Sequence, residues 1–377
     1  MHTNSDSRLK PGGLMLLIAT AFIAALAFTV QASAQRMITF DAPGAGTGAG
    51  QGTAGVAINN QGWVTGNYTE NSNANYGFLR TPDGKFISIN VPGAGTSTSS
   101  QGTYPWDINS EGVIAGSYVD ASNLQHGFLR TPDGKITPFD VPGAGTAPGQ
   151  GTFLGNINDL GEIAGAYIDA SNVEHGFVRT PDGKFAIFNI PVADQLTYVD
   201  YVNGINNAGE FAGGYIDTNG AWHGWVRYPD GSFSTFEAPN AAFGAGQGTD
   251  TSGINGEGAV AGQYYDASNV SHGFVRSAFG SFTTFDAPGA GTGAGQGTSG
   301  TAVNNLGVVA SGFTDANGVE HGFDRTPDGR IIEFDAPGAG TASGQGTYVF
   351  ENNLEGVNVG FYLDTNNVFH GFLWMPR

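Results

Sequence analysis

The chain has 377 residues, including 62 glycines, 17 prolines and no cysteine, and its formal charge is −19 at pH 7. This acidic balance argues against nucleic acid as a partner, because nucleic acid needs a basic surface. Cations, basic partners and neutral polyols stay compatible with it. Aromatic residues make up 12% of the chain, which is enough for a packed core and argues against disorder.

Residues 1–34 have the pattern of a secretory signal peptide. Arg8 and Lys10 precede a mostly apolar run from Leu14 to Val30, and Ala32-Ser33-Ala34 supplies the small residues of a cleavage site. The alternative is a membrane anchor, since such a run is at the lower limit for a span. The placement of the cleavage triplet favours a cleaved signal. We therefore expect a secreted protein, extracellular or periplasmic, with no membrane insertion after cleavage.

A unit of about fifty residues then recurs seven times. The tripeptide His-Gly-Phe, or a close variant of it, begins at positions 76, 126, 175, 223, 272, 321 and 370, in steps of 48 to 50 residues. A period of this length is the sequence signature of a solenoid or a propeller.

One unit divides into four short runs at turn signals. In residues 151–191, runs rich in Ile, Val, Phe and Tyr cover 152–158, 162–169, 173–180 and 184–190, and Asn, Asp and Pro-Asp-Gly corners separate them. The connection to the next unit is longer and rich in glycine, as at 42–53. This asymmetry predicts a blade of four antiparallel strands, followed by a crossover loop from the outer strand to the next inner strand.

The two ends of the chain complement each other. Residues 36–41 match only the fourth strand of a unit, and the last unit stops after its third strand, at 372–374. A closed ring explains this split, because the N-terminal strand would complete the last blade. We predict an all-β fold: a single domain at 35–377 that forms a seven-bladed β-propeller of four-stranded antiparallel blades, closed by the N-terminal strand.

The units resemble a family of bacterial extracellular repeats known for a His-Ala-Phe (HAF) motif. The matching pattern is Gly-Ile-Asn-x-x-Gly-x-x-x-Gly followed by Asp-x-x-Asn-x-x-His-Gly-Phe, and it recurs with substitutions over nearly all of residues 36–377. This chain departs from the family in carrying glycine between His and Phe. The resemblance implies secretion and a propeller-like repeat, and it implies no activity and no catalytic residues.

Most repeated polar residues are expected to be structural. Six of the seven histidines occupy one position per unit, too far apart to share one metal, and we expect each to bond the preceding loop. The Asp-x-x-Asn corners supply too few oxygens for calcium and are typical of Asx turns. A repeated asparagine should cap the first turn, and a repeated arginine should pair with a neighbouring blade. The sequence therefore predicts no metal, no cofactor and no catalytic residue in the repeated part.

The candidate ligand site lies where the repeat is broken. The crossover at 191–201 is not glycine-rich, and Trp222 precedes His223 where other units have Gln, Glu or Ser. Aromatic faces beside carboxylates are typical of sites for sugars and cations. Tyr104 and Trp106 enter the second unit at the same end. The alternative is that these side chains fill a less regular blade contact. The candidate ligand-binding residues are Asp194, Tyr198, Asp200, Tyr201 and Trp222.

The leading functional hypothesis is a secreted, monomeric, non-enzymatic binding propeller that recognises a glycan or a protein partner through its crossover-loop face. One alternative is a carbohydrate-active enzyme, a hydrolase or lyase, for which Asp194 and Asp200 are the only off-pattern acids that we identify from the sequence. A second alternative is a structural cell-surface repeat protein.

Overall fold

Turn chemistry divides the chain into short strands, as the third repeat illustrates. Asn158 Oδ1 accepts a hydrogen bond from Glu162 N (2.8 Å), Asp169 Oδ1 accepts one from Val173 N (2.9 Å), and Gly183 has a φ of +85°. Such bonds and a left-handed glycine close tight turns. The strands between them are β10 (Gly151–Ile157), β11 (Ile163–Ile168), β12 (Glu174–Arg179) and β13 (Phe185–Phe188). The four predicted strands of this unit are confirmed, each boundary shifting by one or two residues.

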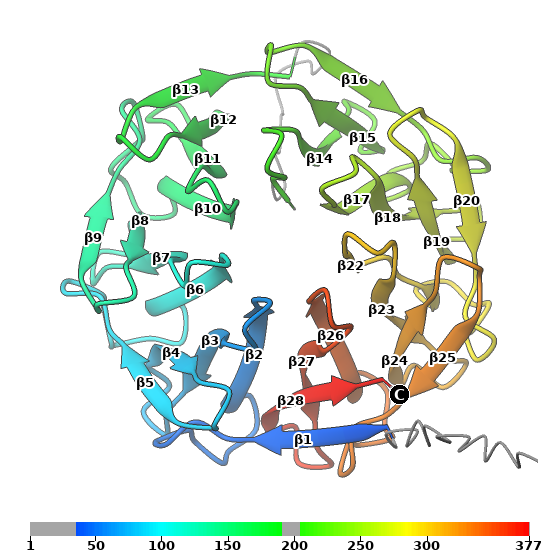
Figure 1. Cartoon of the computed structure of the whole chain (residues 1–377), viewed down its shortest axis with the longest axis horizontal. Helices are drawn as coiled ribbons and strands as arrows, with labels where there is room; N and C mark the ends of the chain where they lie inside the picture. Colours follow the sequence, from blue (N-terminus) through cyan, green and yellow to red (C-terminus); the bar gives the residue numbers. More distant parts are fainter. Residues whose placement is uncertain (1–34, 191–203, 377) are drawn as a thin grey trace, which may run out of the picture. The chain divides into compact units, whose positions relative to one another are not determined.

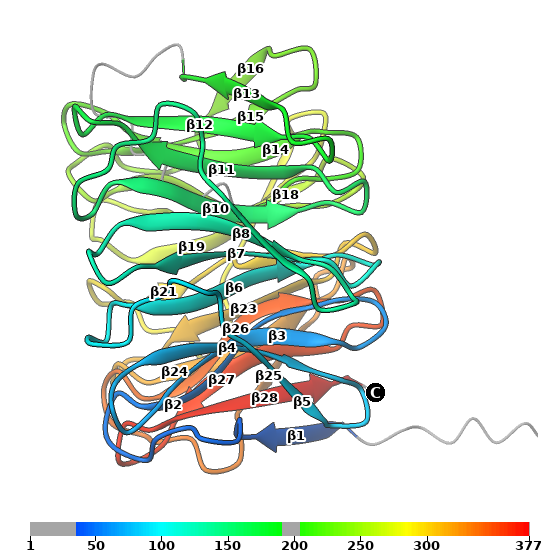
Figure 2. The ribbon, with the colours of Figure 1, turned by 90° about the vertical axis from the view of Figure 1, so that its left-hand side faces the viewer.

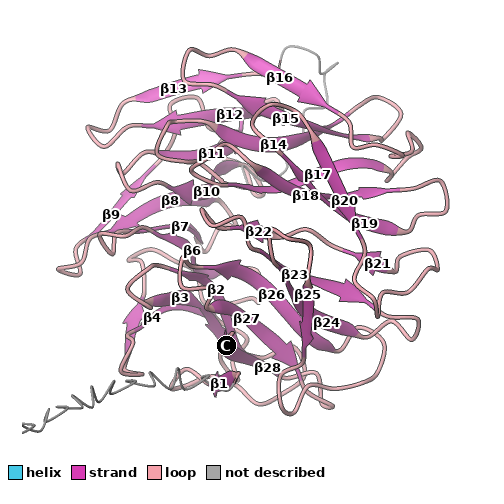
Figure 3. Cartoon of the chain, turned by 45° about the vertical axis from the view of Figure 1, so that its right-hand side comes forward, coloured by secondary structure: helices cyan, strands magenta, loops and turns pink. Residues whose placement is uncertain are grey.

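The computed structural model describes residues 35–190 and 204–376. The backbone divides after Ala34 into two units, and the described strands belong to the second, Gln35–Arg377. Within the described ranges the regular structure consists of 28 strands without a helix, which confirms the all-β class (Figure 3). Accordingly, these ranges contain no helix with the length and apolar character needed to cross a bilayer.

Strands of four types alternate along the chain. The first strands are β2 (Gly52–Ile58), β6 (Gly102–Ile108), β10, β17 (Gly248–Ile254), β21 (Gly297–Thr298) continued by β22 (Ala302–Val303), and β26 (Gly346–Asn352). The second strands are β3 (Val64–Thr69), β7 (Ile114–Val119), β11, β14 (Phe211–Ile216), β18 (Val260–Tyr265), β23 (Val309–Thr314) and β27 (Asn358–Leu363).

Third and fourth strands complete each group. The third strands are β4 (Asn75–Arg80), β8 (Gln125–Arg130), β12, β15 (Trp222–Arg227), β19 (Ser271–Arg276), β24 (Glu320–Arg325) and β28 (Phe369–Met375). The fourth strands are β1 (Arg36–Phe40), β5 (Phe86–Ile89), β9 (Ile136–Phe139), β13, β16 (Phe233–Phe236), β20 (Phe282–Phe285) and β25 (Ile331–Phe334). We call each group a set and number the sets along the chain from set one (β2–β5). Set four is described from Gly204 onward.

The sets stand around a common axis. Within each set, neighbouring strands pair antiparallel, and the first strands lie nearest the axis while the fourth strands lie outermost (Figure 1). In side view the strands run between two loop-bearing faces (Figure 2). The crossover face carries the loops between sets and the Asp corners, such as 141–150 and 169–172. The opposite face carries the Asn turns and the Pro-Asp-Gly turns, such as 158–161 and 181–183.

The N-terminal strand pairs with the last strand of the chain. β1 runs antiparallel to β28, from Arg36 opposite Met375 to Phe40 opposite Gly371, so the predicted pairing with the strand that contains Phe372 is present. The buried Phe40 ring meets the Phe78 ring edge-on, with 6.2 Å between their centroids. β1 thus takes the fourth-strand place of set seven and also packs against set one.

Seven asparagines link the sets close to the axis. Each follows a first strand or its equivalent, and its Nδ2 donates to the backbone carbonyl of the matching asparagine in the next set at 2.9–3.2 Å. In donor order they are Asn59, Asn109, Asn158, Asn206, Asn255, Asn304 and Asn353, and Asn353 donates back to Asn59. Asn59 Oδ1 also accepts from Gln61 N and Trp63 N, so the predicted capping role is confirmed.

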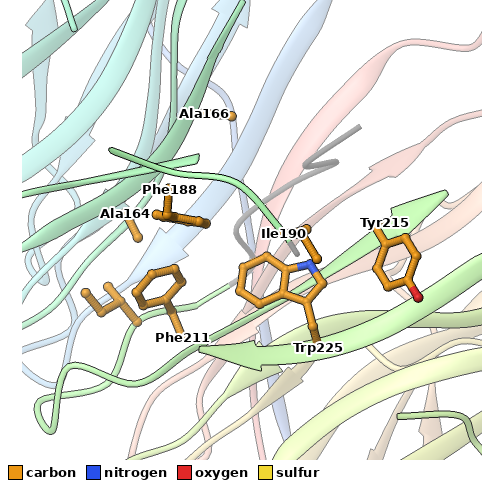
Figure 4. Packing of buried hydrophobic residues seen from close by; sticks show 8 residues of the cluster. Ala164, Ala166, Phe188, Ile190, Phe211, Tyr215 and Trp225 are labelled. Atoms are coloured by element: carbon orange, nitrogen blue, oxygen red, sulfur yellow. The ribbon is translucent and has the colours of Figure 1, made fainter. Parts of the chain in front are cut away.

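Aromatic rings fill the seams between sets. Between sets three and four, Phe188 lies 5.2 Å from Phe211 and 6.2 Å from Trp225, measured between ring centroids (Figure 4). The guanidinium of Arg227 lies 5.0 Å from the centre of the Phe188 ring, a cation–π contact. The repeated arginine makes the same contact in the pairs Arg80–Phe40, Arg179–Phe139, Arg276–Phe236 and Arg325–Phe285. Its predicted pairing with a neighbouring unit is confirmed, with an aromatic ring as the partner.

The seam between sets six and seven is polar where the other seams are apolar. Asp324, Asn352 and Asn358 are all buried, and the equivalent positions of the other sets carry Leu, Ile, Val or Phe. Asn358 Nδ2 donates to Asp324 Oδ1 at 2.7 Å, whereas Oδ1 of Asn352 and of Asn358 have no hydrogen-bond partner within the described chain. Burial raises the pKa of Asp324 to about 7, against the opposing effect of the Asn358 bond.

We expect Asp324 to make the folded state less stable as pH rises. An ordinary aspartate in the unfolded chain loses its proton near pH 4, whereas folded Asp324 keeps it until about pH 7. Stability should therefore fall through this window by on the order of 4 kcal/mol and stay level above it. The double change Asp324→Leu and Asn358→Val, which restores the apolar pattern, should raise the melting temperature more at pH 8 than at pH 4.

Thermal unfolding of both proteins from pH 4 to pH 8 checks this expectation. The exposed Asp328 of the same set is a suitable control, because hydrogen bonding, first of all from Thr326, lowers its pKa. The difference in melting temperature between Asp328→Asn and the wild type should therefore not grow as the pH rises. If the melting temperatures of the wild type and the double variant differ by the same amount at every pH in this range, the role given to Asp324 is contradicted.

Candidate ligand site in the axial cavity

A cavity of about 890 Å³ follows the axis between the first strands. A β-bulge in several of these strands decides which side chains line it. In β6 the register jumps from Pro105 to Asp107, and in β26 from Val349 to Glu351, so that Trp106 and Phe350 have no partner on the second strand. Bulges re-aim side chains in this way and are frequent beside functional sites.

The side chains at the bulge positions differ in chemistry from one wall of the cavity to another. Trp106 and Phe350 line it and each remain 38% exposed. Tyr104 extends the aromatic surface on β6, since its ring stacks on Trp106 with 6.2 Å between centroids. The corresponding residues in sets five and six are Ser252 and Thr301, which line the wall beside β17 and β22. The hydroxyl group of Thr301 is hydrogen-bonded to that of Ser311, with 2.9 Å between the oxygens. Figure 1 shows β6 and β22 on opposite sides of the axis.

Two carboxyl groups follow the bulges directly. Asp107 Oδ1 accepts from Ile108 N (2.7 Å) and its Oδ2 accepts from Ile157 N of the next set (2.9 Å). Glu351 Oε2 accepts from Ile58 N of the next set (2.9 Å). Burial raises the pKa of both groups, and the charge of Asp107 raises the pKa of Glu351 further. Both carboxyl groups therefore resist ionisation beside the cavity unless a cation approaches.

Sequence reasoning missed these two acids. At the position before the final Ile-Asn of the first strand, or its equivalent, the seven units carry Ala57, Asp107, Asn156, Gly204, Gly253, Ala302 and Glu351. Asp107 and Glu351 break this pattern, so the expectation that Asp194 and Asp200 are the only off-pattern acids is wrong. A column-by-column comparison of the units would have found them.

The residues predicted as the ligand site are only partly described. Asp194, Tyr198, Asp200 and Tyr201 lie outside the described residues. Trp222 begins β15, and its backbone N donates to Gln247 O at 2.7 Å, which places it at the crossover face. The residues at its position in sets two and three, Gln125 and Glu174, line the axial cavity. Trp222 thus holds a position that borders the cavity elsewhere in the repeat.

The repeated histidines lie at the crossover face between two polar partners. His175 stacks on Tyr167 with 4.9 Å between centroids, its Nδ1 lies 2.7 Å from Asn189 Oδ1, and its Nε2 lies 3.3 Å from Asp169 Oδ2. The predicted bond to the preceding loop is therefore present at His175, whereas Nε2 of the other five repeated histidines lies 3.5–3.8 Å from the matching aspartate Oδ2. Hydrogen bonding, first from Val173 N, lowers the pKa of Asp169 and keeps it ionised. Within the described ranges, no group of three or more acidic or histidine side chains is placed to hold a metal ion.

Comparisons with known proteins bear on the fold. No protein-family model matches the chain. No curated protein matches its sequence. Among solved structures the chain is similar to the BP39L lectin from Burkholderia pseudomallei, with a TM-score of 0.57 and 10% identity over 85% of this chain and 96% of that one. It also resembles puromycin hydrolase (TM-score 0.49, 13% identity, 83% of this chain and 50% of that one) and AofleA from Arthrobotrys oligospora (0.46, 13%, 81% and 92%).

The likeness to BP39L concerns the fold alone. Together with the radial four-stranded sets it identifies the chain as a β-propeller.

We expect His175→Ala to destabilise the protein without affecting any metal content. The change removes the ring that links Asp169 to Asn189, so it should cost about 1–3 kcal/mol, the usual cost of leaving a partly buried partner unsatisfied. Denaturant unfolding measures this loss. Stoichiometric zinc or copper in protein purified without added metal, lost in the variant, would instead assign the histidines to a metal site.

Proposed function

We propose that this chain is a secreted, non-enzymatic, carbohydrate-binding propeller of seven blades that holds a saccharide in its axial cavity. The observation that carries the proposal is the two-sided lining, with the partly exposed Trp106 on one wall and the polar residues Ser252 and Thr301 on another. A pyranose ring has the matching chemistry, because its C–H face packs on an aromatic ring while its hydroxyl groups form hydrogen bonds.

Closure of the propeller is part of this proposal. The pairing of β1 with β28 and the hydrogen bond from Asn353 back to Asn59 support a ring whose last blade is completed by the N-terminal strand. A closed ring keeps the walls of the cavity at fixed distances, and ligand sites are usually largely pre-formed in this way.

The fold relationship makes a saccharide the first ligand to test. BP39L is a lectin by name, and it shares the fold over most of both chains. The acidic composition, the predicted signal peptide at 1–34 and the resemblance to the HAF repeats favour an exported protein that meets glycans outside the cytoplasm. We propose that it acts as a monomer, and the crossover face around Trp222 stays available for a glycan chain or protein partner.

Binding is favoured over hydrolysis by the state of the cavity acids. A glycosidase needs one carboxyl group as an acid and a second as a base or nucleophile, on either side of the bond to be cleaved. Both oxygens of Asp107 are already held by backbone N–H groups, and one oxygen of Glu351 is held in the same way. These bonds suit a role in fixing the walls of the site.

The proposal predicts that Trp106 and Trp222 behave differently. Trp106→Ala removes the exposed stacking face in the cavity and should weaken saccharide binding about five- to thirty-fold, equivalent to about 1–2 kcal/mol. Trp222→Ala, at the crossover face, should leave binding nearly unchanged. A glycan array selects the ligand, and titration calorimetry on the three proteins gives the affinities.

Melting temperatures serve as the control for folding. If Trp222→Ala abolishes binding while Trp106→Ala retains it, the site belongs to the crossover face and the cavity proposal fails. If the array yields no bound saccharide, or if the selected saccharide is cleaved, the carbohydrate-binding function fails.

A further inference from the structure

The axial cavity is lined by acidic side chains without basic ones among the described residues. Its described lining residues include Asp107, Asp159, Glu174 and Glu351, and they include no lysine, arginine or histidine. Asp159 is already engaged by Ser110 N and Asn207 Nδ2 near the opposite face. Asp107 and Glu351 remain as the two acids that stand beside the bulge residues Trp106 and Phe350.

The surroundings of these two acids disfavour their ionised form. Burial opposes the ionisation of both groups, and the charge of Asp107 further opposes that of Glu351. A bound cation would relieve both effects, because an opposite charge nearby favours the ionised form. A carboxylate can accept about four hydrogen bonds, and the side chain of Glu351 accepts one from Ile58 N, which leaves capacity for a donor from a ligand.

The same charges discriminate against anionic sugars. The carboxylate of a uronic acid or a sulfate ester would enter a partly desolvated space without a basic residue among the described lining. Burying such a charge without a partner is costly. An ammonium group is favoured instead, because it can donate hydrogen bonds to a carboxylate.

We infer that the saccharide held in the axial cavity carries a free amino group, as in a glucosamine unit, with the amine directed to Glu351 and Asp107 and the sugar ring stacked on Trp106. This inference rests on the proposed carbohydrate-binding function and specifies its ligand class. No bond is formed or broken in it, and the recognition is by charge and stacking alone.

Three matched probes test it by titration calorimetry at pH 6.5: a glucosamine trimer, the N-acetylglucosamine trimer and a galacturonic acid trimer. We expect the glucosamine trimer to bind about tenfold more tightly than its neutral N-acetylated form, and the galacturonic acid trimer to show no binding. Added NaCl should weaken the binding of the glucosamine trimer and leave that of the neutral trimer unchanged.

Variants locate the effect. Glu351→Gln keeps an acceptor for Ile58 N and should reduce the preference for the amine, measured as the ratio of the affinities for the glucosamine trimer and its N-acetylated form, at least threefold. Glu355→Gln makes the same charge change on an exposed turn outside the cavity and should bind all three probes like the wild type. Trp106→Ala should weaken both glucosamine-based trimers alike.

The outcomes separate the two claims. Equal affinity for the amine and its N-acetylated form, or preference for the galacturonic acid trimer, overturns the inference while the carbohydrate-binding function stands. An amine preference that survives in Glu351→Gln, with that variant folded by its melting temperature, removes Glu351 from the site and also overturns the inference. Absence of binding for these and all other saccharides rejects the proposed function itself.

Discussion

The hydrogen bonds of the seven asparagines near the axis are the constraint on which the other features depend. Each asparagine uses its Oδ1 to hold its own turn and its Nδ2 to hold the backbone of the next set, so one side chain sets both the end of a first strand and its distance to the neighbour. Paired and buried amides of this kind are costly to disrupt. Because the first strands are fixed at this end, the bulges that precede the asparagines present their extra residues toward the axis, and the cavity follows from that arrangement.

At the outer side of each set, a glycine determines how closely the fourth strand approaches. A Cβ atom on Gly176 would lie 2.2 Å from the Phe188 ring, and one on Gly371 would lie 2.3 Å from the Phe40 ring. This close approach explains why glycine occupies the middle position of the repeated His-Gly-Phe tripeptide. The glycine lets an aromatic ring of the fourth strand lie directly on the third, where the repeated arginine of the next set then covers it. Strand order, seam packing and the place of β1 are thereby linked.

Much of this architecture could be predicted from the sequence because it depends on local signals that recur. Corner residues gave the strands of each unit, and the split of strand types between the ends gave the pairing of β1 with β28. The site could not be predicted in the same way. A bulge arises from the register between two strands and has no mark of its own in the sequence, so Trp106 was recognised as unusual but was assigned to the crossover end. Asp107, which follows Trp106 directly, was not recognised from the sequence. Of the residues first proposed as ligand contacts, Trp222 alone lies in the described chain.

The departures from the repeat fall into two groups with different physical consequences. Trp106, Phe350, Asp107 and Glu351 border a cavity, where polar and aromatic groups can be satisfied by a ligand. Asp324, Asn352 and Asn358 are enclosed in a seam, where two amide oxygens lack partners among the described residues and a carboxyl group keeps its proton to about pH 7. The second group lowers stability and has no access to a ligand. A comparison of equivalent positions among the repeats identifies this group as readily as the first. Departure from the pattern is therefore insufficient to identify a functional residue in a repeat protein. The deciding property is whether the departing side chain faces a space that a ligand can enter, and here this property separates Trp106 and Glu351 from Asp324.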